Sequence, residues 1–87
     1  MTKIEKLLQR LYSLPKDFTY SELKKIMKSL GFIEHTKGKT SGSRVAFHNQ
    51  QHNLIIRLHK PHPGNILKRY QLVEVIKIIK KLGDNDE

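Results

Sequence analysis

The sequence predicts an α+β fold in which a three-stranded antiparallel sheet packs on helices. Residues 43–48 and 53–59 have apolar side chains at every second position, and successive strand residues point to opposite sides of a sheet. Three other stretches carry apolar residues spaced three and four apart, which is typical of amphipathic helices. Because short turns separate the strands, we expect a meander with one face on the helices and one face open.

Two helices are predicted near the N-terminus. The first ends before Pro15, because proline lacks the backbone N–H that continues a helix. The second begins at Thr19, which forms a capping-box pattern with Glu22, and ends at Gly31. The apolar stripes are Ile4, Leu7, Leu8, Leu11 and Tyr12 in the first, and Leu23, Ile26, Met27 and Leu30 in the second. Residues 1–18 are thus a predicted N-terminal helix and linker of one 87-residue domain.

Three strands are predicted next. The first spans Phe32 to Thr36, and a basic Gly/Ser turn runs from Lys37 to Gly42. Ser43 to His48 and Asn53 to His59 are expected to form a hairpin through a polar turn at 49–52. Its core-facing residues are Val45, Phe47, Leu54, Ile56 and Leu58. Its open face carries Arg44, His48, Arg57 and His59.

The predicted last helix follows an ordered loop. Residues 60–65 include two prolines, which lack donors for a strand ladder, and Asn65 can cap a helix from about Ile66 to Leu82. Gly83 is expected to end this helix and to leave a frayed acidic tail over residues 84–87. The predicted core stripe is Ile66, Tyr70, Leu72, Val73, Val75, Ile76 and Ile79.

The basic composition narrows the classes of partner. The chain has 17 Lys and Arg against 8 Asp and Glu, a formal charge of +9. This charge favours a polyanion, with nucleic acid first, an anionic membrane second and an acidic protein third. No apolar run approaches the ~20 residues of a spanning helix, and the charged N-terminus is unlike a signal peptide, so we expect a cytoplasmic protein. Without cysteine the chain has no disulfide, thiolate zinc site or cysteine nucleophile.

The predicted order of elements, an α-β-β-β-α core after an extra N-terminal helix, is the arrangement of double-stranded-RNA-binding domains (dsRBDs). The segments 30–32 (LGF), 42–47 (GSRVAF) and 59–65 (HKPHPGN), the last followed by a helix, resemble the motifs of HicA-type toxins. The resemblance runs from Tyr20 to Leu82. It implies a dsRBD-like fold, mRNA interferase activity in a toxin–antitoxin system, and a HicB-type antitoxin as partner.

The motif that carries catalysis in that family is altered in this chain. The family has Gly-Ser/Thr-His at the start of the second strand, and its catalytic histidine corresponds to Arg44. Arginine stays protonated and cannot act as a general base near neutral pH. Either another histidine therefore transfers the proton, or the protein does not cleave RNA.

RNA cleavage without a metal needs a base for the 2′-hydroxyl, an acid for the 5′ leaving oxygen and cations for the phosphorane charge. His48 and His59 are the predicted base and acid, with His59 slightly favoured and His62 third. Arg44 and Arg57 are the predicted phosphate clamp, so Arg44 belongs to the catalytic set. The alternatives are the ordinary polar surface of a solvent-facing sheet, a non-catalytic RNA-binding module, and a basic domain that binds an acidic protein.

The predicted RNA contacts extend beyond the sheet. They are Lys37, Lys39, Ser43, Arg44, Arg57, Lys60, His62 and Lys68. Backbone donors at the start of the last helix would add to them, while solvation explains any single lysine equally well. The pairs His48/His52 and His59/His62 are spaced like metal ligands, but they lie on no predicted helix and near no obvious carboxylate. We therefore expect neither a metal nor a cofactor.

Overall fold

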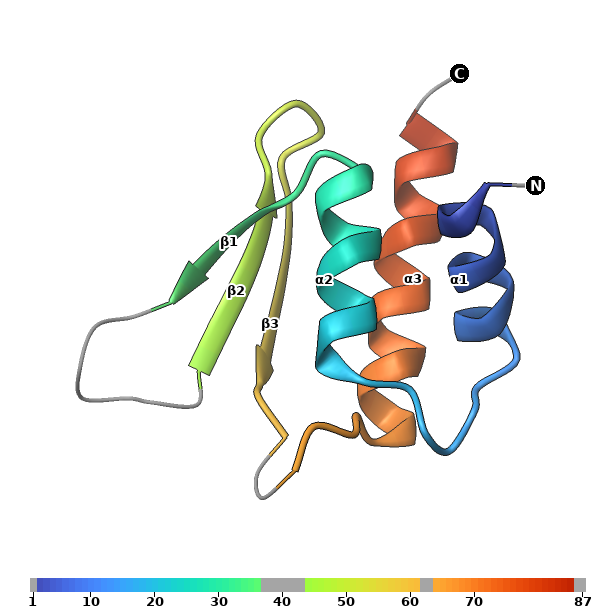
Figure 1. The fold of residues 1–87 in the computed structure, drawn as a ribbon. Helices are drawn as coiled ribbons and strands as arrows, with labels where there is room; N and C mark the ends of the chain where they lie inside the picture. Colours follow the sequence, from blue (N-terminus) through green and yellow to red (C-terminus); the bar gives the residue numbers. More distant parts are fainter. Residues whose placement is uncertain (1, 37–43, 62–63, 86–87) are drawn as a thin grey trace.

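The computed structural model describes residues 2–36, 44–61 and 64–85. Its sheet has three antiparallel strands in the order β1-β2-β3, and the helices lie together on one side of it (Figure 1). In chain order the elements are α1 (Lys3–Tyr12), α2 (Tyr20–Ser29), β1 (Ile33–Thr36), β2 (Arg44–Asn49), β3 (Leu54–His59) and α3 (Arg69–Asn85). The predicted α+β meander, with an extra N-terminal helix and one open face, is therefore confirmed.

The hydrophobic core lies between the sheet and the helices. Val45, Phe47 and Ile56 are buried on β2 and β3, whereas Arg57 and His59 are exposed, as the alternation predicts. The helices contribute Leu23, Ile26 and Met27 from α2 and Leu72 and Val75 from α3. Burial of these apolar side chains drives folding, and it decides which face of the sheet is left to solvent.

The N-terminal helix packs on α2 and α3 (Figure 1). Arg10 joins it to α2, because the guanidinium lies 2.9 Å from a carboxylate oxygen of Glu22 and 2.9 Å from one of Asp17. The predicted capping box is present: the Thr19 hydroxyl accepts from the Glu22 N–H at 3.1 Å, and the Glu22 carboxylate accepts from the Thr19 N–H at 2.9 Å. Gly31 follows α2 with φ of 88°, the left-handed conformation expected of it.

The last helix begins at Arg69, not at Ile66. Residues 65–67 pair instead with the chain around the start of α2. The Tyr20 N–H donates to the Asn65 carbonyl at 2.8 Å, and the Leu67 N–H donates to the Phe18 carbonyl at 2.9 Å. Since this bridge uses the backbone that a helix would need, the prediction that Asn65 caps the helix is wrong.

Other boundaries of the predicted helices also need correction. The last helix passes through Gly83 to Asn85, because glycine within a helix costs only about 1 kcal/mol. Tyr12, Ile66 and Tyr70 are exposed by 46%, 44% and 63%, so they do not belong to the core stripes. Ile66 lies before the helix, and Tyr70 lies on the outer side of its first turn.

Within the described residues, no helix is long and apolar enough to span a membrane.

The hairpin turn lies one residue later than predicted. Asn49 is the last residue of β2 and is buried. Its side chain donates to the Leu30 carbonyl at 3.0 Å and accepts from the His52 N–H at 3.0 Å. This polar side chain therefore belongs to the interior, where it ties the turn to the end of α2.

Candidate nucleic-acid interface

The open face of the sheet is organised in rows by the strand register. In the first row Arg44 of β2 lies opposite His59 of β3. In the middle row Ala46 lies opposite Arg57 on β3 and opposite His35 on β1. Residues paired across antiparallel strands point to the same side, so these five side chains share the face that the helices leave free.

The third row is largely apolar. His48 lies between Ile55 of β3 and Ile33 of β1. The two isoleucines are 40% and 53% exposed, and they leave His48 half-buried. The open face therefore has a cationic end and an apolar end, with Ala46 in the middle.

A shallow hollow of about 530 Å³ is centred on this face. Its lining includes Arg44 and Arg57, the three histidines His35, His48 and His59, and Ala46. Ala46 makes this hollow possible, because a longer side chain at this position would fill the space between His35 and Arg57. Among the described residues, no acidic side chain lines the hollow and none forms an ion pair with either arginine. Both guanidinium groups are therefore available to an anion.

His35 is a titratable residue of this face that the sequence analysis did not single out. Its ring lies near that of His48, with centroids 6.3 Å apart and planes inclined by 45°. The signal was present: Phe32 is apolar and buried, so alternation along the strand would have placed Ile33 and His35 on the opposite side. A strand of four residues offers too short a pattern for its faces to stand out.

The predicted site residues separate into three groups. Arg44, His48, Arg57 and His59 all lie on the open face, as predicted. Lys60 and Lys68 do not line the hollow; the Lys60 ammonium lies 5.6 Å from the centre of the Tyr20 ring, and Lys68 is exposed just before α3. Four residues lie outside the described part of the chain, namely Lys37, Lys39, Ser43 and His62.

The end of β3 is held by Gln71, which the sequence did not single out. The Gln71 side chain is buried, and its amide N–H donates to the His59 carbonyl at 2.9 Å. Its amide oxygen accepts from the Lys68 N–H at 3.0 Å, which satisfies a free donor at the start of α3. One side chain therefore fixes the beginning of α3 relative to His59.

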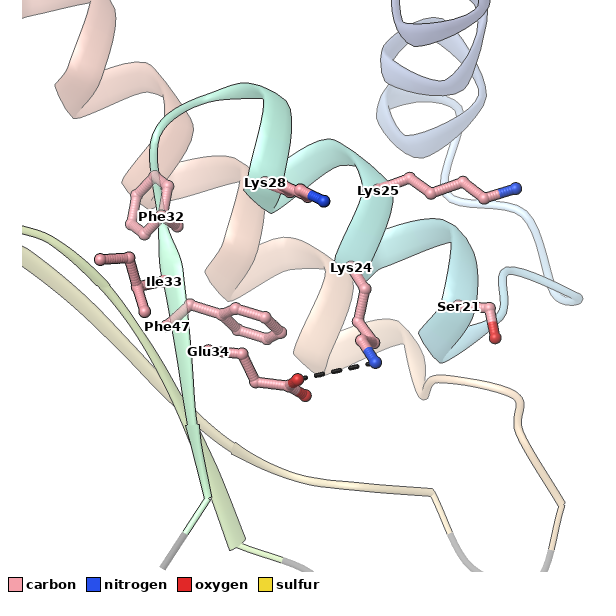
Figure 2. Close-up of a pocket in the computed structure, with 8 residues that line it drawn as sticks. All are labelled: Ser21, Lys24, Lys25, Lys28, Phe32, Ile33, Glu34 and Phe47. Carbon is pink, nitrogen blue, oxygen red and sulfur yellow. Dashed lines mark ion pairs between the residues drawn. The ribbon is translucent and has the colours of Figure 1, made fainter.

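A second hollow, of about 550 Å³, lies on the helix side of the sheet between α2 and β1. Figure 2 shows Lys24, Lys25 and Lys28 along α2, and Glu34 and Phe47 pointing from the sheet toward that helix. Lys24 and Glu34 form an ion pair at 3.6 Å.

Glu34 connects this crevice to the buried side chain of Tyr20. Glu34 accepts a hydrogen bond from the Tyr20 hydroxyl. Burial, followed by that hydrogen bond, raises the pKa of Tyr20 well above its ordinary value of 10.0. Of the residues that the structure describes, no histidine lines the crevice. The open face of the sheet is therefore the better candidate for acid–base chemistry.

The histidines of two spaced pairs were considered as metal ligands, and no metal site was expected from the sequence. Across residues 2–36, 44–61 and 64–85, no group of three or more His, Cys, Asp or Glu side chains lies in a position to hold a metal ion. Of the two spaced pairs, His48/His52 lies within the described residues and His62 does not.

Comparison with protein families gives one decisive match. Residues 20–83 match the family model described as the HicA toxin of bacterial toxin–antitoxin systems, which covers α2, the whole sheet and most of α3. The chain belongs to the HicA family. It is therefore a toxin of a toxin–antitoxin system, and a cognate antitoxin is its implied partner.

Neither the curated proteins nor the solved structures include a match to this HicA chain. The matched region begins at Tyr20, so α1 lies outside it. Arg44, which the resemblance aligns with the motif histidine of HicA toxins, is the first residue of β2. It lies on the open face, opposite His59.

Proposed function

We propose that this HicA-family toxin binds and cleaves RNA on the open face of its sheet, in the cytoplasm, and that a cognate HicB-type antitoxin restrains it. The observation that carries the proposal is the gathering of two arginines and three histidines around Ala46 on a chain of charge +9. Arginine binds phosphate through paired donors, and histidine is the side chain whose protonation changes near neutral pH.

The binding step depends on the two arginines. Arg44 and Arg57 lie in adjacent rows on β2 and β3, so a phosphate above Ala46 is within the span of both side chains. Because Ala46 projects only a methyl group, the phosphodiester can approach the sheet closely. Arg44 then acts as a permanently charged clamp that stabilises the phosphorane.

The chemical step transfers two protons and needs no metal. The 2′-oxygen attacks phosphorus, so that the bond between O2′ and phosphorus forms while the bond between phosphorus and O5′ breaks. A neutral histidine takes the 2′-hydroxyl proton, and a protonated histidine gives a proton to O5′. The products are a 2′,3′-cyclic phosphate and a 5′-hydroxyl. His48 and His59 are the proton-transfer candidates that the sequence supplies.

The proposal is tested by removing equal charge from two places. The variant Arg44→Ala/Arg57→Ala and the control Lys80→Ala/Lys81→Ala, on the exposed side of α3, each remove two positive charges. We expect the first to abolish cleavage and to lower the slope of log affinity against log salt by about 1 to 2, because two phosphate contacts are lost. Equal behaviour of the two variants would show that the open face is not the RNA site.

Arg44 at the catalytic position of the HicA motif favours one second function, RNA binding without cleavage. In that case the toxin would act by occupying its RNA. Salt-sensitive binding of an RNA that stays intact over a long incubation selects this alternative. Growth arrest that a co-expressed antitoxin relieves is expected under both functions, so the fate of the RNA distinguishes them.

A further inference from the structure

The geometry points to His35 as a catalytic residue that acts with His48 as the acid–base pair of the cleavage reaction. This inference rests on the proposed function, which it deepens by naming the second proton-transfer group. It starts from the two rings on neighbouring strands, whose centroids lie 6.3 Å apart. Both rings line the hollow that Arg44 and Arg57 also line.

The spacing of the two rings suits an in-line displacement at phosphorus. The attacking O2′ and the leaving O5′ lie on opposite sides of the phosphorus, and each proton-transfer atom must come within about 3 Å of its oxygen. The two proton-transfer groups must therefore lie close enough together to contact opposite sides of a single phosphate. His35 and His48 are diagonal neighbours on β1 and β2 and meet this requirement.

His48 and His59 are less well placed to contact one phosphate from both sides. His59 lies opposite Arg44, whereas His48 lies opposite Ile55, so four residues of strand separate the two rows. At about 3.3 Å per residue that is about 13 Å along the sheet. His35 lies in the middle row opposite Ala46, where we expect the phosphate, and it is a diagonal neighbour of His48.

The surroundings of the pair combine cationic and apolar groups. Among the described residues, the charged or titratable groups that share the hollow with His35 and His48 are Arg44, Arg57 and His59. His35 is exposed on the edge strand, and His48 is half-buried between two isoleucines. One member of the pair takes the proton from the 2′-hydroxyl, and the other, protonated, delivers one to O5′. His35 thus lies on the strand that neighbours the strand of Arg44.

The test uses the full chain and an RNA oligonucleotide in EDTA. Purified His35→Gln, His48→Gln, the double variant and His59→Gln are compared with the parent for single-turnover cleavage rate and for Kd. We expect His35→Gln and His48→Gln each to lower the rate by about 100-fold or more while Kd changes less than about threefold. The double variant should be little worse than either single variant, because the pair acts as a unit, and His59→Gln should lower the rate less than His35→Gln does.

Two further readouts separate catalysis from structure. Thermal melts of the variants should match the parent, since His35 is exposed, and the pH–rate profile should lose one of its two limbs in His35→Gln. A His35→Gln protein that cleaves at the parent rate overturns the inference and leaves the proposed function standing. A parent protein that does not cleave RNA at all overturns both.

Discussion

The buried side chain of Gln71 donates a hydrogen bond to the main-chain carbonyl of His59 at 2.9 Å and accepts one from the Lys68 N–H at 3.0 Å. The final residue of β3 and the first turn of α3 are therefore held by a single amide. Because His59 shares the open face with Arg44, this contact fixes one edge of the candidate RNA site from inside the molecule.

Replacing Gln71 should loosen that edge. Gln71→Ala leaves the His59 carbonyl and the Lys68 N–H without this partner, and an unsatisfied buried polar group costs about 1 to 3 kcal/mol. We expect the free energy of unfolding to fall by about that amount in urea titrations. Gln51→Ala, in the exposed hairpin turn, is the matched control. Equal stability of the two variants would mean that the amide contributes nothing.

The Arg10–Glu22 contact should make stability depend on acid pH. The hydrogen bond from Arg10, the largest cause, holds the pKa of Glu22 below its ordinary value of 4.5 in the folded protein. Below that value the unfolded chain therefore binds more protons, so stability falls as the pH drops from about 4.5 through the lower folded-state pKa. Above 4.5 the contribution is fully present.

Glu22→Gln tests this linkage. Glutamine keeps the capping-box acceptor for Thr19 but loses the charge that faces Arg10. We expect a lower Tm than the parent at about pH 7 and a smaller fall in Tm between about pH 5 and pH 3. Glu74→Gln is the control, because its ion pair with Lys77 is about two-thirds exposed on both sides and contributes little. Parallel pH curves for the parent and Glu22→Gln would contradict the prediction.

The hollow above Ala46 should be needed for activity. In Ala46→Leu the larger side chain occupies the space between His35 and Arg57, so a phosphate can no longer approach the middle row. We expect weaker RNA binding and at least tenfold slower cleavage with little change in Tm, because Ala46 lies outside the core. Ala46→Ser, which is nearly the same size, should behave like the parent. Unchanged cleavage by Ala46→Leu would place the reaction elsewhere.

The sequence predicted most of the open face because strand alternation is a local signal. Apolar residues such as Val45, Phe47 and Ile56 recur at every second position of the two strands. The residues between them, which include Arg44, His48, Arg57 and His59, therefore face the other side of the sheet. Which residues lie on this face was therefore predictable without knowledge of any distant contact. The register that places Arg44 opposite His59 was not predicted, because the hairpin turn lies one residue later than expected.

The missed features depend on contacts between distant parts of the chain. The start of α3 was misplaced because Leu67 pairs with Phe18 through the backbone, a long-range contact that leaves no local pattern. The hydrogen bonds of Gln71 could not be predicted from the sequence either, since glutamine is common on helix surfaces. His35 was overlooked because its strand is short, and because its nearness to His48 depends on how β1 pairs with β2.

Metal-independent cleavage is tested most directly by incubating the purified parent protein with an RNA oligonucleotide in excess EDTA and identifying the products by mass spectrometry. We expect cleavage that leaves a 2′,3′-cyclic phosphate and a 5′-hydroxyl, and no cleavage of the 2′-O-methyl oligonucleotide, which lacks the attacking hydroxyl. Intact RNA under conditions in which the protein binds it, or cleavage that appears only after a divalent metal ion is added, would show that the proposed mechanism is wrong.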